Sequence, residues 1–414
     1  MLAKKKLKKG LLKRVVLVKR SCLKGKVFQT TFSCSLTKKY IEEDVKQASY
    51  KLKERKQKKK KITNIILLTV NLLIVVGVFV YYGFTSGIKS FRELIFENVA
   101  YKYLLIAVAL FLFAIIVDTF KYYQLIKKST GKRRVITSLN THMIGRYYDC
   151  VTPFAVGGQP FQIYYLLKKG LSGSKATSIP LAKHFFNMIA FTIISIVVLI
   201  SQLAMPLTAS PVIITLAIIG IISNFVIVLI ILLFSVSKRV GPALVIKILK
   251  LLNKMHIIKN YKTTFFKVAK FVKNYQRSMK DFSKSAWTIF VQIFLAFLSY
   301  VAIYSIVYFI YLAFLPLNSS PVIVSWFDIF CCAVLCDLCS GIMPLPGGTG
   351  LAEISFDSLF KRLFSITVFP WALLIWRILT YFAFILIGGL KVIFSFFKSL
   401  KKSKTENMNI FNKK

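Results

Sequence analysis

The sequence predicts an all-α polytopic membrane protein with about six full spans and two re-entrant broken helical segments arranged as an inverted repeat. Hydrophobic residues make up 56% of the 414 positions, whereas soluble domains contain roughly 45–50%. The formal net charge is nevertheless +45, so charged and apolar residues must be segregated along the chain. Residues 62–84 and 211–234 carry no charge, and each exceeds the roughly 20 residues that a helix needs to cross a ~30 Å hydrocarbon core.

The N-terminal tail, residues 1–61, holds 22 Lys and Arg against four acids. Basic residues beside spanning helices attract anionic lipid headgroups and set topology. We therefore expect the membrane and anionic phospholipid as partners, and no nucleic acid. The first apolar run begins at Ile62, is long enough to span, and lacks the small-residue pattern of a cleavage site.

The predicted membrane domain covers residues 62–396 and is followed by a basic tail, residues 397–414. Its full spans are residues 62–84, 99–120, 180–205, 211–236, 285–314 and 366–394. Less regular segments occupy residues 136–167 and 326–361.

Orientation follows from the distribution of Lys and Arg, which favour the cytoplasmic side. The two tails, residues 121–134 and the loop 237–284 are basic, whereas residues 205–211 are uncharged. We therefore expect a multi-pass plasma-membrane protein with both termini in the cytoplasm. This topology makes the first irregular segment enter and return on the cytoplasmic face, and the second on the outer face.

Each irregular segment contains a cluster of Pro and Gly. The sequences are GRYYDCVTPFAVGGQPFQ at residues 145–162 and MPLPGGTGLAE at residues 343–353. Pro removes a backbone donor and Gly permits positive φ, so a continuous helix is disfavoured. Half-helix N-termini after the paired glycines would present N–H groups to a phosphate or carboxylate. A kink that only allows close packing is the alternative, but two such interruptions favour a binding site.

Several charges fall within or beside the apolar segments. They are Asp149, Lys183, Asp337, Glu353 and Arg377. An Asp, Lys or Arg at mid-bilayer costs roughly 2.5–3.5 kcal/mol on insertion scales, so these charges need a polar cavity or mutual pairing.

Two of these charges have alternative interpretations. Arg377 is a candidate for a lipid phosphate or for a carboxylate partner. Glu353 either contributes to the site or complements the helix dipole in the first turn after the glycines. Arg146 and Asp149 are spaced i,i+3 and can pair with each other.

The histidines and cysteines suggest no chemistry. His142 and His256 have no evident partner, and His184 is expected at the interface. Cys331, Cys332, Cys336 and Cys339 lie in an apolar segment, where packing is a simpler explanation than a metal cluster. We expect no metal, no cofactor and no catalytic residue.

The predicted substrate-binding residues combine the two interruptions with the intramembrane charges. They are Arg146, Asp149, Thr152, Pro153, Gly157, Gly158, Gln159, Gln162, Asp337, Pro346, Gly347, Gly348, Glu353 and Arg377.

These motifs resemble a known family. TPF at residues 152–154, GGQPFQIYYL at 157–166, PLPGGTG at 344–350 and WRILTY at 376–381 are similar to the flippase-like transmembrane domain of the lysylphosphatidylglycerol synthases, the multiple peptide resistance factors. The resemblance implies a membrane domain of eight elements, built around broken helices, that moves aminoacylated phospholipid between leaflets.

The chain departs from that family at three places. Many relatives have a Glu-Arg pair where this chain has Lys183 and His184, and an acidic residue and Arg where it has Gln159 and Gln162. The full synthases also carry a cytosolic acyltransferase domain, whereas about 20 polar residues follow the last span here. We therefore expect a stand-alone form.

Three functions remain open from the sequence. The first is a lipid flippase or transporter of a lysylphosphatidylglycerol-like lipid. The second is phosphatidylglycerol lysyltransferase activity. The third is a non-catalytic membrane partner of a separate synthase or transferase, and any of the three is compatible with a homo-oligomer.

Overall fold

The structure is a computed structural model that describes residues 99–155, 157–204, 211–237, 261–317, 324–343, 345–365 and 368–390, with a few positions between 243 and 250. Within these residues every regular element is a helix and no strand occurs. The predicted all-α fold is confirmed.

Five helical stretches are long and apolar enough to cross a membrane. They are α4 (Tyr101–Thr130), α7 (Gly173–Ala204), α8 (Pro211–Val236), α11 (Ala286–Phe314) and a last span that starts with α14 (Phe369–Arg377) and continues to Leu390. The predicted span at residues 62–84 and the two tails lie outside the described residues. Among these stretches α8 exposes most of its apolar side chains, as expected for a helix that faces lipid.

Two helices are longer than predicted. We placed a boundary at residue 120 because Lys121 begins a basic run, but α4 continues to Thr130 and ends at Gly131, whose φ is 71°. Lys121 is completely buried, because it pairs with Asp118 one turn earlier. Helix α7 begins at Gly173 and runs through Pro180, which a membrane helix tolerates when its neighbours satisfy the freed carbonyl.

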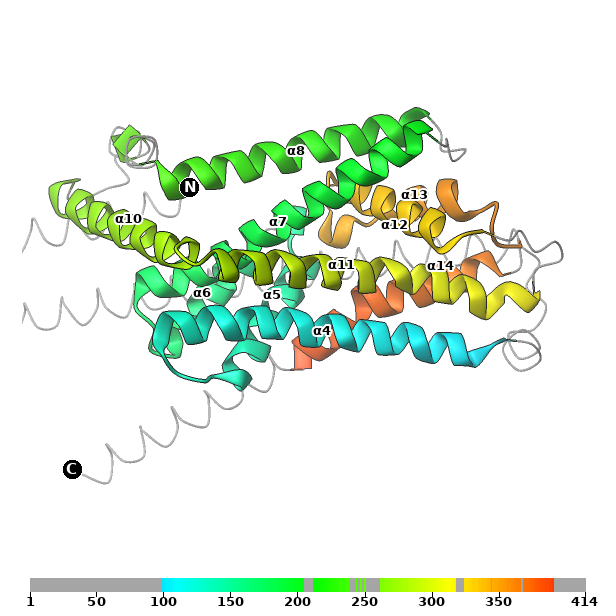
Figure 1. The fold of residues 1–414 in the computed structure, drawn as a ribbon, viewed down its shortest axis with the longest axis horizontal. Coiled ribbons are helices and arrows are strands. Elements are labelled where there is room, and N and C mark those ends of the chain that lie inside the picture. The colour runs from blue at the N-terminus through cyan, green and yellow to red at the C-terminus, as the bar shows by residue number, and fades with distance from the viewer. Residues whose placement is uncertain are drawn as a thin grey trace, which may run out of the picture. The chain divides into compact units, whose positions relative to one another are not determined.

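The two central helices, α4 and α11, run antiparallel. The Ala100 amide donates to the Ala313 carbonyl at 2.9 Å, so the start of α4 lies beside the end of α11 (Figure 1). Small buried residues such as Ala107, Ala296 and Ala302 allow the two backbones to approach closely, as is typical of membrane helix interfaces.

Both irregular segments are broken helices. The first consists of α5 (Val135–Val151), the 3₁₀ turn η1 (Pro153–Ala155) and α6 (Gly158–Lys168). The second consists of α12 (Trp326–Ser340), the 3₁₀ turn η3 (Pro346–Gly348) and α13 (Leu351–Phe360). They lie beside opposite halves of α4 and α11 (Figure 1), and η1 contacts η3. Which membrane face each segment enters stays a prediction.

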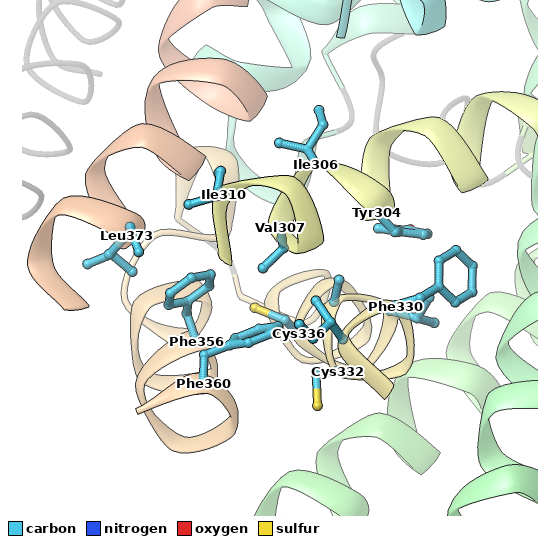
Figure 2. Close-up of a cluster of buried hydrophobic side chains, with 14 of the residues drawn as sticks. Tyr304, Ile306, Val307, Ile310, Phe330, Cys332, Cys336, Phe356, Phe360 and Leu373 are labelled. Atoms are coloured by element: carbon cyan, nitrogen blue, oxygen red, sulfur yellow. The ribbon is translucent and has the colours of Figure 1, made fainter. Parts of the chain in front are cut away.

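The main apolar core surrounds α12. Figure 2 shows Cys336 pointing toward Phe356 and Phe360, whereas Cys332 points to another side of α12; both belong to the same buried cluster. The four cysteines of α12 are free and buried, as packing residues are expected to be.

A smaller core forms around α10 (Tyr261–Ser283), which lies in the basic loop and packs against α7. Its buried side chains are Val272, Tyr275, Met279 and Phe282. This helix is amphipathic, because Lys270, Lys273 and Lys280 are exposed whereas these four side chains are buried.

Candidate functional site

The first break is closed by side chains of its own segment. The Thr152 hydroxyl accepts a hydrogen bond from the Gly157 amide at 2.9 Å and donates to the Tyr148 carbonyl at 2.6 Å. The Asp149 carboxylate accepts from the Gly158 amide at 2.8 Å. These two amides were expected to be open to a phosphate, and that expectation is wrong because hydrogen-bond acceptors within α5 and at its C-terminal end already bind them.

The paired glycines are needed for this close approach. A Cβ at Gly158 would meet the Asp149 carboxylate, and a Cβ at Gly157 would meet Thr152. Pro153 begins the intervening 3₁₀ turn. The break is therefore compact: the N-cap residue of α6, Gly157, has no side chain to cap the helix, and Asp149 and Thr152 supply the oxygen acceptors that an N-cap side chain usually provides.

The two glutamines of the motif join helices. The Gln162 side-chain amide donates to the Thr141 carbonyl at 3.1 Å, and its side chain occupies the space that a Cβ at Gly145 would need. Gln159 lies 3.3 Å from Nδ1 of His184 on α7. Gln162 is buried, so it binds the first segment together.

The second break combines left-handed glycines with a buried ion pair. Gly347 and Gly348 both have φ of 65°, and Gly350 has 96°. The Gly350 amide donates to Oε2 of Glu353 at 2.6 Å. Oε1 of Glu353 lies 2.6 Å from Nη2 of Arg377, and the two side chains are 3% and 5% exposed. Glu353 therefore binds the start of α13, as one interpretation predicted, and the carboxylate partner of Arg377 is Glu353; a role of Glu353 in substrate binding stays a prediction.

Arg377 also supports the glycine turn directly. Its Nη1 donates to the Gly347 carbonyl at 3.4 Å, and its guanidinium lies over the Trp376 ring at 4.9 Å. Pro346, at the start of this turn, is buried. The last span thus holds the second break from outside its own segment.

Tyr381 joins the two breaks, and the sequence prediction missed it. Its hydroxyl donates to the Cys150 carbonyl at the end of α5 at 3.0 Å, and its ring fills the space that a Cβ at Gly347 would need. Tyr381 lies in the π-helical stretch η4 (Ile378–Phe382), a conformation that is frequent at functional sites. Because residues four apart lie on the same face of a helix, the spacing of Tyr381 from Arg377 could have indicated that both side chains face the breaks.

Each broken segment also carries a charged side chain of opposite sign, Arg146 on α5 and Asp337 on α12. Asp337 is exposed, and its carboxylate accepts a hydrogen bond at 2.7 Å from the hydroxyl of the buried Tyr304. The Arg146 guanidinium lies 4.5 Å from the Phe384 ring centre and within electrostatic reach of Asp149, Asp118 and Asp337.

No described carboxylate comes within 4.0 Å of Arg146. The i,i+3 pair between Arg146 and Asp149 is therefore not formed, because Asp149 binds Gly158 instead.

A second ionic cluster, centred on Asp118, was not predicted from the sequence. Asp118 pairs with Lys121, lies 3.4 Å from Lys183 Nζ and lies 3.7 Å from Nδ1 of His142. We gave His142 no partner, and the structure corrects this. The i,i+3 spacing of Asp118 and Lys121 could have indicated this cluster. It was overlooked because the predicted span ended at residue 120, between the two residues.

Within the described part of the chain, no group of three His, Cys, Asp or Glu side chains comes together. The polar groups that the two breaks do bring together are charged side chains and backbone amides and carbonyls.

Comparison with known proteins agrees with this architecture. The family model described as the lysylphosphatidylglycerol synthase TM region matches residues 67–388. No curated protein matches the chain. The chain is thus a multi-pass membrane protein that belongs to the family of lysylphosphatidylglycerol synthase transmembrane regions.

Proposed function

We propose that this protein moves an aminoacylated phospholipid, or a lipid with a related headgroup, between the two leaflets. The observation that carries the proposal is the pair of opposite charges Arg146 on α5 and Asp337 on α12, which interact electrostatically and lie on the two broken segments whose 3₁₀ turns contact each other. A lipid with a phosphate and an amino group has the complementary charges.

In this proposal Arg146 binds the phosphate and Asp337 binds the amino group. A guanidinium suits phosphate because it presents a planar fork of donors. Tyr304 fixes the Asp337 carboxylate by its hydrogen bond at 2.7 Å. The other predicted residues of the two breaks support the walls of the site, and Arg377 stabilises the second wall through Glu353.

The physical advantage of such a site is that it replaces water around the headgroup. A charged group at mid-bilayer costs roughly 2.5–3.5 kcal/mol even on the lowest scales. Opposite fixed charges and broken-helix backbone lower that cost when they line the path.

The test is leaflet-resolved labelling in liposomes that contain lysylphosphatidylglycerol and the purified protein. A membrane-impermeant amine reagent reports the lipid that reaches the outer leaflet. Loss of a hydrogen bond to a charged group costs about 1.5–3 kcal/mol, so Arg146→Gln and Asp337→Asn should each slow translocation about tenfold to hundredfold.

Arg277→Gln and Asp281→Asn provide matched controls, because both side chains are exposed on α10. They should translocate at the wild-type rate. Unchanged translocation in both Arg146→Gln and Asp337→Asn would overturn the proposal.

The same liposomes distinguish transport from synthesis. We expect no lysylphosphatidylglycerol to form when phosphatidylglycerol and lysyl-tRNA are supplied. Its formation by this chain alone would replace the transport proposal with lysyltransferase activity.

We also infer a plasma-membrane location with the basic loop containing α10 in the cytoplasm. The abundance of Lys and Arg in this loop supports it. A single cysteine at the exposed position Lys280, in a cysteine-free background, should react with an impermeant thiol reagent only after the cells are opened. Labelling in intact cells would reverse the orientation.

A further inference from the structure

A pocket of about 290 Å³ lies beside α10. This volume is close to the lower end of the range for ligand pockets, about 300–1,000 Å³. Its apolar lining consists of Phe265, Ala269 and Val272 of α10, together with Ile246 and Leu249 from the stretch between α8 and α10. None of the described lining residues belongs to either break or to the proposed headgroup charges, so this is a separate site.

Two polar residues complete the described lining, Lys273 and Gln276. The Gln276 side-chain amide donates to the Ser237 carbonyl at 3.0 Å, so it holds α10 against the end of α8. Lys273 is exposed, and no described carboxylate comes within 4.0 Å of its ammonium. The pocket therefore combines an apolar wall with one cation that can bind a ligand.

The pocket lies at the level where one span ends and another begins. Ser237 directly follows α8, and α10 ends at Ser283, shortly before α11 begins at Ala286. Trp287, in the first turn of α11, is 72% exposed, and tryptophan is enriched at membrane–water interfaces. Helix α10 contacts α8 (Figure 1), and α8 exposes most of its apolar side chains. The pocket is therefore next to a lipid-facing helix, at the surface of the membrane.

The charge around the pocket selects its occupant. Residues 237–284 contain 13 Lys and Arg and a single acid, Asp281, which pairs with Lys284 at 3.0 Å. The N-terminal tail holds 22 Lys and Arg against four acids, and residues 397–414 hold six Lys against one Glu. Neither tail, nor a second copy of α10, supplies a complementary charge. A phospholipid with an anionic headgroup supplies both the negative charge and the apolar chain.

We propose that this pocket binds an anionic phospholipid from the adjacent leaflet. One acyl chain packs against the apolar lining, and the Lys273 ammonium binds the phosphate. Amphipathic helices with basic polar faces bind membrane surfaces in this way, by apolar burial combined with attraction to anionic lipid. The bound lipid would hold α10 at the membrane surface. This site does not rest on the proposed function, because it uses neither Arg146 nor Asp337.

The test is photo-crosslinking of the full chain in phosphatidylcholine nanodiscs. The probe is phosphatidylglycerol with a photoreactive diazirine in its acyl chain, and mass spectrometry of peptides locates the crosslinks. We expect crosslinks at α10 residues that line the pocket, and we expect unlabelled phosphatidylglycerol to compete for them. Equal labelling of α10 by a phosphatidylcholine probe, or no crosslink in α10, would overturn the proposal.

A pocket-filling variant tests the acyl-chain contact. Ala269 is exposed, so Ala269→Trp should fold and fill the pocket. Labelling of α10 should fall about tenfold or more, because excluding even two methylene groups weakens binding by that factor. Ser283→Trp is the matched control, because Ser283 is exposed on the same helix and outside the pocket, and it should label as wild type does. Equal labelling of Ala269→Trp and wild type would overturn the proposal.

A charge variant tests the phosphate contact and keeps the experiment decisive if Ala269→Trp does not fold. Lys273→Gln should raise the probe concentration for half-maximal labelling about fivefold, the effect of one basic residue near an anionic surface. Lys132→Gln removes the same charge at an exposed position after α4 and should leave that concentration unchanged. Equal shifts in the two variants would show a general surface attraction and overturn the site. Arg146→Gln should label α10 as wild type does, whatever it does to translocation, so the two proposals fail independently.

Discussion

The two breaks contain similar residues but are held together in different ways. The first is closed by Asp149 and Thr152, which lie within nine residues of the glycines that they bind. The second uses three glycines with positive φ and a carboxylate that pairs with Arg377 on another span. The same Pro-Gly pattern can therefore mark a self-contained turn or one that depends on a distant helix.

This difference has an energetic consequence. Hydrogen bonds within the first segment form and break with that segment. The buried ion pair of the second break is strong only while both partners are present, because either charge alone is left in an apolar interior. The second break should therefore respond more strongly to single substitutions.

The largest effect is expected for Arg377→Ala. It leaves Glu353 buried without its cation, which costs about 3–5 kcal/mol. Thermal unfolding of the solubilised protein, followed by circular dichroism, measures the loss. The double variant Arg377→Met with Glu353→Gln should be more stable than Arg377→Ala, since no charge is left unpaired. Equal stability of the single and double variants would show that the ion pair does not support the second break.

The next effect concerns Gly347→Ala. Its φ of 65° disfavours any side chain, and its new Cβ would also meet the Tyr381 ring. Strain of this kind costs about 1–3 kcal/mol. Gly131→Ala is the matched control, because its φ is 71° but nothing lies within 4 Å. Equal losses at the two glycines would mean that the ring moves away freely.

A smaller loss is expected at the first break for Asp149→Ala. Removing a cap acceptor costs about 0.5–2 kcal/mol, again measured by thermal unfolding. Asp149→Asn retains an oxygen that can accept from Gly158 and should remain near wild type. If Asp149→Ala destabilised as much as Arg377→Ala, the contrast between the two breaks would be lost.

The smallest effect is expected for Tyr381→Phe, which keeps the ring but removes its hydrogen bond to Cys150. One such bond is worth about 0.5–1.5 kcal/mol. Tyr164→Phe, on an exposed side chain, should change the midpoint of unfolding little. A midpoint for Tyr381→Phe that equals the Tyr164→Phe value would argue against a link between the breaks.

Hydropathy and turn chemistry predicted much of the fold. The bounds of α8 and α11 differ from the predicted spans by at most one residue, because uniformly apolar runs have clear ends. The breaks fall at the predicted Pro-Gly clusters. The position of Glu353 in the first turn of α13 could also be predicted, because the Gly350 amide that it binds lies only three residues before it in the sequence.

The partners of the charged side chains were less predictable. Lys121 looked like the start of a basic loop because its helical continuation depends on burial against Asn187 of α7. Asp149 was expected to pair with Arg146 or to bind a ligand. Instead the chain turns back after α5, and the Gly158 amide donates a hydrogen bond to the Asp149 carboxylate. The i,i+3 spacing of Asp118 and Lys121 was a local signal, but the contact with Asn187 and the return of the Gly158 amide depend on how the chain folds back, which sequence spacing does not show.

Tyr381 couples the positions of the two breaks, because it contacts both of them. Moving the end of α5 away requires either loss of the hydroxyl contact with Cys150 or movement of the last span with it. Moving the last span shifts the ring that rests against Gly347. A movement of either broken segment is therefore coupled to the other through Tyr381, unless its hydrogen bond to Cys150 or its contact with Gly347 is lost first.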